Sequence, residues 1–173
     1  MNKGTVVWIT GLSGVGKTTI SRRLTDIFRE QSKQCVLLDG DEIRRAFPDT
    51  HSGHDRDSRL INAKRNSSLA KLLSDQGFIV IIATMSLFTE IHEWNRENFS
   101  SYLEILVNVP MSVLEERDFN GLYSRAREGL INNVVGVDLN YDMPTNPDLI
   151  LDNSGDVSNI SMLAREIAKL LKD

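Results

Sequence analysis

The sequence predicts an α/β domain with a five-stranded parallel β-sheet and helices on both of its faces. Short apolar runs alternate with longer segments of helical periodicity, which is the pattern of successive β-α-β units. The run Phe78–Ala83 is apolar at every position, as expected of a strand that helices cover on both sides. A glycine-rich turn lies between the first predicted strand and the first predicted helix, where α/β domains commonly bind phosphates.

The first half of the chain contains two predicted strands and two predicted helices. Thr5–Thr10 is short, apolar and rich in β-branched residues, so we expect a buried strand. Lys17–Ser32 has apolar residues at helical spacing, and Gln34–Asp39 is expected to be the second strand. Arg56–Gln76 is expected to be a helix, and Gly77 is placed to end it. The apolar residues expected on its buried face are Leu60, Ala63, Leu69, Leu72 and Leu73.

The second half continues this alternation and then departs from it. The elements expected here are strands at Phe78–Ala83, Tyr102–Val109 and Leu149–Asp152, and helices at Glu90–Asn98, Ser112–Arg117 and Val157–Lys172. The segment Phe119–Thr145 has no strong periodicity and is rich in Gly, Asn, Asp and Arg. Long irregular segments in compact domains are usually lids or binding loops. We therefore expect a lid over approximately residues 119–145.

Length and composition favour one soluble enzyme-sized domain over residues 1–173. The formal net charge is −4, so there is no overall basic field that would favour nucleic acid. Cys35 is the single cysteine, which excludes an intrachain disulfide and suits a reducing compartment. No apolar run approaches the length needed to cross a bilayer, and no signal peptide is expected. We expect a cytoplasmic protein without a membrane partner.

The turn after the first predicted strand carries a complete phosphate-binding motif. Gly11–Thr18 matches G-x-x-x-x-G-K-[ST] at every defined position. The glycines let backbone N–H groups turn toward an anion, Lys17 can contact the β- and γ-phosphates, and the Thr18 hydroxyl can bind Mg²⁺. The motif predicts a P-loop kinase fold with ATP and Mg²⁺ as cofactors. The residues expected to bind ATP here are Gly11, Ser13, Gly14, Val15, Gly16, Lys17, Thr18 and Thr19.

An acidic pair follows the second predicted strand. Asp39 and Asp41 flank Gly40 at the carboxyl end of that strand, which is the edge where parallel sheets bind ligands. A kinase needs a carboxylate to hold Mg²⁺ or to accept the proton of the attacking hydroxyl. The alternative is a simple turn, for which Asp-Gly-Asp is suitable. Beside the phosphate-binding motif we favour catalytic roles for Lys17, Asp39 and Asp41, with Thr18 and Asp39 on the metal.

Several further stretches make the sequence resemble the adenylylsulfate (APS) kinase family along nearly its whole length. The stretches that carry the resemblance are Trp8–Thr19, Leu38–Arg44, Arg59 with Asn62, Ala70–Leu72, Glu116–Asp118, Gly121–Tyr123, Ala126–Arg127 and Asn146–Pro147. Members of this family transfer the γ-phosphoryl group of ATP to the ribose 3′-hydroxyl of adenylyl sulfate. The resemblance implies the same reaction here, a nucleotide as the acceptor, and a homodimer.

The resemblance also implies roles for individual residues. Asp41 would orient or deprotonate the acceptor hydroxyl with support from Asp39, although which of the two is the base stays open. The residues that would contact the acceptor are Asp41, Arg44, Arg59, Asn62, Met85 and Ser86. Arg117 would stack on the adenine of ATP. Arg125 and Arg127 would close over the phosphates from the lid.

The departures from the family pattern concentrate on the acceptor side. APS kinases hold the substrate adenine between two phenylalanines, whereas His54 and Val134 occupy these positions here. Stacking on an aromatic ring stabilises a bound base by about 1–3 kcal/mol, so adenine binding weakens unless His54 stacks instead.

Three hypotheses follow. The chain phosphorylates adenylyl sulfate with an altered clamp, or it phosphorylates another nucleotide such as the cytidine diphosphate derivative cytidine diphosphoramidate. A non-catalytic nucleotide-binding domain is the third alternative, and it predicts loss of Lys17, Thr18 or Asp41, all of which are present.

Overall fold

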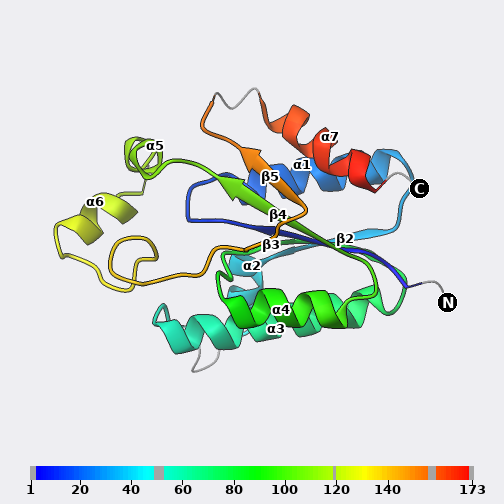
Figure 1. Ribbon diagram of the computed structural model, residues 1–173, viewed down its shortest axis with the longest axis horizontal. Helices are drawn as coiled ribbons and strands as arrows, with labels where there is room; N and C mark the ends of the chain where they lie inside the picture. The colour runs from blue at the N-terminus through cyan, green and yellow to red at the C-terminus, as the bar shows by residue number, and fades with distance from the viewer. Residues whose placement is uncertain (1–2, 49–52, 119, 156–158, 172–173) are drawn as a thin grey trace.

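The structure of the protein is a computed structural model that describes residues 3–48, 53–118, 120–155 and 159–171. Its centre is a five-stranded parallel sheet in the order β2-β3-β1-β4-β5 (Figure 1). The strands are β1 (Val6–Thr10), β2 (Cys35–Asp39), β3 (Ile79–Ala83), β4 (Tyr102–Asn108) and β5 (Leu149–Asp152). The predicted α/β fold is therefore confirmed, and each predicted strand forms within two residues of its expected bounds.

Helices cover both faces of the sheet, as Figure 1 shows. Helix α1 (Lys17–Glu30) and helix α7 (Ile160–Leu170) pack against each other on one face, while α3 (Arg56–Ser74) and α4 (Thr89–Asn98) lie on the other. Two hydrophobic clusters result, one on each face, because successive strand residues point to opposite sides. Trp8 belongs to one cluster and Ile9 to the other, and both are fully buried. None of the helices in the described ranges is long and apolar enough to cross a membrane.

Three short helices complete the described fold: α2 (Gly40–Ala46), α5 (Met111–Glu116) and α6 (Leu122–Arg127). The sequence-based expectation missed α2 and α6. Helix α2 begins directly after Asp39, whose side chain accepts hydrogen bonds from the backbone N–H groups of Asp41 and Glu42. A carboxylate in this position caps a helix, so the Asp-Gly-Asp stretch starts a helix and is not only a turn. Of the predicted closing helix, positions 157, 158 and 172 lie outside the described residues.

The buried face of α3 combines the expected apolar residues with polar ones. Ala63 is buried, and Leu60, Leu69 and Leu73 pack against the hydrophobic core, so of the expected apolar residues only Leu72 was wrong. Leu72 is 59% exposed, whereas Ser58, Asn62 and Asn66 are buried. These three residues follow one another at intervals of four and therefore share one face of the helix. The polar face is the first sign that α3 lines a binding cavity and does not only pack against the sheet.

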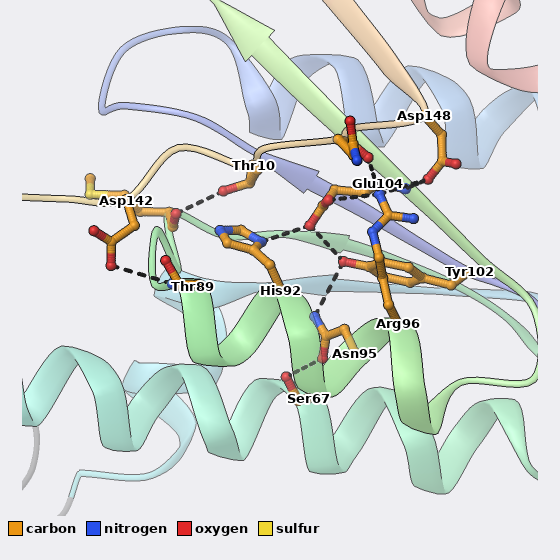
Figure 2. A network of polar contacts seen from close by, with 12 residues as sticks. Thr10, Ser67, Thr89, His92, Asn95, Arg96, Tyr102, Glu104, Asp142 and Asp148 are labelled. Carbon is orange, nitrogen blue, oxygen red and sulfur yellow. Dashed lines mark hydrogen bonds and ion pairs between the residues drawn. The ribbon is translucent and has the colours of Figure 1, made fainter.

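A buried carboxylate joins α4, β4 and the chain segment before β5 (Figure 2). Glu104 in β4 is 1% exposed, and it contacts His92 Nδ1 at 2.6 Å and accepts from Tyr102 Oη at 3.0 Å and from Arg96 Nη2 at 2.9 Å. Burial alone would raise the pKa of Glu104, but these hydrogen bonds and nearby positive charges lower it below its usual value. Arg96 Nη2 also donates to the carbonyl of Asn146. The network thus fixes the chain where it leaves the expected lid.

Candidate functional site

The phosphate-binding turn forms between β1 and α1, where the motif predicts it. Gly11 (φ +141°) and Gly16 (φ +95°) adopt backbone conformations that other residues rarely adopt. A Cβ on Gly11 would lie 2.3 Å from the Val107 carbonyl oxygen, and one on Gly16 would lie 2.5 Å from Asn153 Nδ2. The Asn153 amide donates to the Val15 carbonyl at 2.8 Å and so supports the turn from the loop after β5. Backbone N–H groups at the start of α1 are thereby available to an anion.

Lys17 lies inside this turn and is hydrogen-bonded to it. Its Nζ atom donates to the carbonyl oxygens of Gly11 at 2.9 Å and Leu12 at 2.7 Å. Burial lowers the pKa of Lys17 to about 8, although the nearby charges of Asp41 and Asp39 oppose the shift. A bound phosphate would bring the negative charge that this buried ammonium lacks.

Thr18 and Asp39 form a pair of oxygen ligands at the edge of the sheet. The Thr18 hydroxyl donates to Asp39 Oδ2 at 2.7 Å, while Asp39 Oδ1 accepts from the Asp41 backbone N–H at 2.9 Å. Mg²⁺ prefers oxygen ligands and commonly takes one or two from the protein and the rest from phosphates and water. Among the described residues no group of three or more His, Cys, Asp or Glu side chains could hold a metal without a ligand. The site therefore fits a metal that arrives with a nucleotide.

A cavity of about 820 Å³ extends from this turn across the carboxyl ends of β2 and β3 to α3. Asp41 lines it, with an exposed side chain. All of the predicted acceptor residues line it as well: Asp41, Arg44, His54, Arg59, Asn62, Met85, Ser86 and Val134. Residues far apart in the sequence thus line the same cavity as Lys17, Thr18 and Asp39. A cavity of this size accommodates a small-molecule ligand of nucleotide dimensions.

Arg44 and Arg59 lie close together in the cavity lining and bring positive charge to it. Burial lowers the pKa of Arg59, and the neighbouring charge of Arg44 lowers it further. An anion between the two guanidinium groups would relieve that repulsion. Burial and the same two arginines also lower the pKa of His54, which is therefore neutral at pH 7. Arg44 Nη1 lies 3.1 Å from His54 Nδ1, and the neutral ring can accept this hydrogen bond.

The wall opposite α3 comes from the expected lid. Arg59 Nη2 donates to the Asn133 carbonyl at 2.9 Å, and Val134 is 5% exposed. The aromatic residues that line the cavity are Phe88 and Tyr141, neither of which the sequence reasoning selected. The Arg56 guanidinium lies over the Phe88 ring at 5.3 Å. Asn66 and Thr84 also line the cavity and were also missed, because only the packing of α3 on β3 brings them there.

The remaining predicted residues lie beyond the main cavity. Arg117 and Arg125 line a second hollow of about 300 Å³ beside Ser13 and Gly14. Arg117 donates to the carbonyl oxygens of Asn153, Ser154 and Gly155 at 2.6–2.9 Å. Arg127 is on the surface and pairs with Glu115 at 2.9 Å, so this arrangement of the chain does not bring it to either cavity.

Comparison with known proteins finds that the chain is similar to kinases that act on nucleotides. The family model for adenylylsulphate kinase matches residues 3–152. The chain is 41% identical over 153 residues to a cytidine diphosphoramidate kinase of Campylobacter jejuni, covering 88% of each chain. It is 40% identical to an adenylyl-sulfate kinase of Pseudomonas aeruginosa, covering 85% of this chain and 76% of that protein. The structure of a Mycobacterium tuberculosis APS kinase in complex with AMPPNP and APS superimposes with a TM-score of 0.90 at 32% identity, over the full length of both chains.

Proposed function

The chain belongs to the adenylylsulphate kinase family, a family of phosphotransferases that act on a hydroxyl group, and on this basis we propose that it transfers the γ-phosphoryl group of ATP to the ribose 3′-hydroxyl of a nucleotide. Adenylyl sulfate is the first candidate acceptor, because several of the curated relatives are adenylyl-sulfate kinases. The observation that carries the proposal is the shared cavity, in which Lys17, Thr18 and Asp39 face the acceptor residues around Arg44 and Arg59.

In the proposed reaction each residue acts on one part of the two nucleotides. The turn at Gly11–Thr18 and the Lys17 ammonium hold the β- and γ-phosphates. Thr18 and Asp39 would hold Mg²⁺, which when bound supplies positive charge to the phosphate oxygens. Asp41 accepts the proton of the 3′-hydroxyl as its oxygen bonds to the γ-phosphorus, and ADP leaves with the electrons of the broken bond.

The acceptor and the lid complete the proposal. Arg44, Arg59 and Asn62 hold the anionic part of the acceptor, and its base lies near His54, Met85, Ser86 and Val134. Residues 119–145 act as a lid on a single kinase domain that spans residues 1–173. Arg117 stacks on the adenine of ATP, and closure of the lid brings Arg125 and Arg127 to the phosphates. We place the enzyme in the cytoplasm, where ATP is available, and propose a homodimer from the family resemblance alone.

Cytidine diphosphoramidate is the second candidate acceptor. Two observations favour it: the Campylobacter jejuni relative of that name, and the absence of phenylalanine at the positions of His54 and Val134. Without aromatic rings at these two positions, a large purine base gains less from stacking there, so a smaller pyrimidine loses less.

A direct acceptor screen tests the proposal. The protein is incubated with ATP, Mg²⁺ and either adenylyl sulfate or cytidine diphosphoramidate, and formation of the 3′-phosphorylated product is followed by mass spectrometry. Asp41→Asn is the matched control, and it should still bind ATP while product formation falls at least about a hundredfold. No product from either acceptor would refute the proposal. A clear preference between the two acceptors decides which candidate is the substrate.

A further inference from the structure

Asn66 carries a buried and unpaired hydrogen-bond acceptor and lies beside the main cavity. It lies one turn beyond Asn62 on α3, lines the cavity, and is 3% exposed. Its Nδ2 atom donates to Thr84 Oγ1 at 3.1 Å, and Thr84 Oγ1 lies 2.8 Å from Ser86 Oγ. Among the described residues, Asn66 Oδ1 has no hydrogen-bond partner. The amide nitrogen is therefore held by the protein, whereas the amide oxygen is buried without a partner.

An amide oxygen without a hydrogen-bond partner is unusual for a buried asparagine, because buried polar atoms are normally paired. Asn95, fully buried on α4, shows the ordinary arrangement (Figure 2). Its Oδ1 accepts from Ser67 Oγ at 2.7 Å, and its Nδ2 donates to Tyr102 Oη at 3.3 Å. The two asparagines sit on neighbouring helices of the same layer, so the difference follows from position: Asn95 lies within the packing, and Asn66 borders the cavity.

The cavity also contains an unpaired donor. Arg44 Nε is buried and has no partner within the described part of the chain. A ligand that satisfies both atoms needs an acceptor for the arginine, such as an oxygen of an anionic group, and an N–H or O–H donor for Asn66. A keto or sulfate oxygen opposite Asn66 Oδ1 would instead place two acceptors against each other. The cavity thus differs chemically between nucleotides that present an N–H at this place and nucleotides that present an oxygen.

We propose that Asn66 Oδ1 accepts a hydrogen bond from an N–H group of the acceptor nucleotide and thereby selects amino-bearing acceptors. This inference rests on the proposed kinase function. The N–H can come from the exocyclic amine of the base, as in cytosine or adenine, or from the terminal amide of a diphosphoramidate. The hydrogen bond to Thr84 Oγ1 engages Asn66 Nδ2 and leaves Oδ1 for the ligand.

The test compares acceptors that differ only in that group. For the base, cytidine diphosphoramidate is compared with uridine diphosphoramidate, and adenylyl sulfate with its hypoxanthine counterpart. For the terminal group, cytidine diphosphoramidate is compared with CDP. We expect the amino-bearing member of at least one kind of pair to bind about ten- to a hundredfold more tightly by calorimetry. Preference in the base pairs identifies the base as the source, and preference in the terminal pair identifies the amide.

Two variants and one control assign the preference to Asn66. Asn66→Leu should abolish it by weakening only the amino-bearing acceptor. Asn66→Asp should retain it, because a carboxylate oxygen still accepts from the ligand while Thr84 donates to the other oxygen. Asn140→Leu makes the same change at an exposed position of the cavity lining and should leave the preference unchanged. ADP binding to each variant, measured in parallel, reports whether it is folded.

The failure of this inference is distinct from the failure of the kinase proposal. Absence of ATP-dependent phosphorylation of every acceptor would refute the kinase function. Phosphorylation with equal affinity for the amino-bearing and oxygen-bearing members of all pairs would overturn the role of Asn66, as would an unchanged preference in Asn66→Leu. Loss of the preference in Asn66→Asp would overturn it even if Asn66→Leu does not fold.

Discussion

The lowered pKa of Lys17 should make the affinity for nucleotides depend on pH around pH 8. With a pKa of about 8, the protonated fraction of Lys17 falls from about nine-tenths at pH 7 to about one-tenth at pH 9. Only the protonated, ammonium form of Lys17 can neutralise charge on the phosphates of ATP. We therefore expect the dissociation constant of ATP with saturating Mg²⁺ to rise about tenfold between these two pH values.

Lys17→Arg supplies the control for this prediction. A guanidinium stays protonated at both pH values, so the variant should lose the pH dependence even if its affinity is lower throughout. Isothermal titration calorimetry at pH 7 and pH 9 measures both proteins. In the wild type, binding should also take up protons near pH 8, which appears as a dependence of the observed heat on the buffer. Equal wild-type affinity at the two pH values, or the same tenfold change in Lys17→Arg, would refute the reasoning.

The same pKa has a consequence for the unliganded protein. Lys17 has an ordinary value of 10.5 when unfolded and about 8 when folded. Between these values the unfolded chain binds more protons, so this group makes the free energy of unfolding rise with pH. Urea denaturation at pH 7.5 and pH 9.5 should show this rise in the wild type and not in Lys17→Arg. A wild-type free energy that falls over this window in step with the variant would contradict the assignment.

Three further predictions concern the surroundings of the site. Folding lowers the pKa of Glu104, so the stability that its carboxylate gives the fold should be complete above pH 4.5 and be lost as the pH falls further. Glu104→Gln should remove this acid sensitivity and, in urea titrations, lower the free energy of unfolding at pH 7 by about 3 kcal/mol. Asn153→Ala leaves the Val15 carbonyl unpaired and should reduce stability by about 1–3 kcal/mol in thermal unfolding and weaken ATP binding; unchanged ATP affinity would separate the loop from the phosphate site. His54→Phe combined with Val134→Phe should lower the KM for adenylyl sulfate if that nucleotide is the acceptor, and no change would argue against adenine stacking at these positions.

The sheet could be predicted because its strands are short apolar runs whose character does not depend on their neighbours. The short helices α2 and α6 could not. The Asp39 side chain that starts α2 belongs to residue types that serve equally as turn residues and as helix caps, and only the backbone geometry distinguishes the two roles. The expected position of Leu72 was wrong, since this residue is 59% exposed, although the other apolar residues expected on the buried face of α3 are buried or pack against the core.

The phosphate-binding turn could be located from sequence because all of its parts are contiguous between Gly11 and Thr18. The acceptor wall is assembled from α3, the end of β3 and the segment around Val134, so its members have no common spacing. Asn66 did leave a signal, since Ser58, Asn62 and Asn66 recur every four residues on one helical face.

Arg59 connects helix α3 to the segment around Asn133 through hydrogen bonds of its guanidinium group. Its Nε donates to the His54 carbonyl at 2.6 Å, and its Nη2 donates to the Asn133 carbonyl at 2.9 Å. An anion that takes these protons competes with the backbone of the segment around residue 133. Binding of an anion to Arg59 and the hydrogen bond from Arg59 to the Asn133 carbonyl are then thermodynamically linked. The free energy by which the bound anion weakens this hydrogen bond equals the free energy by which the hydrogen bond weakens anion binding. Anion binding at Arg59 and the position of the segment around Asn133 are thus coupled through a single guanidinium group.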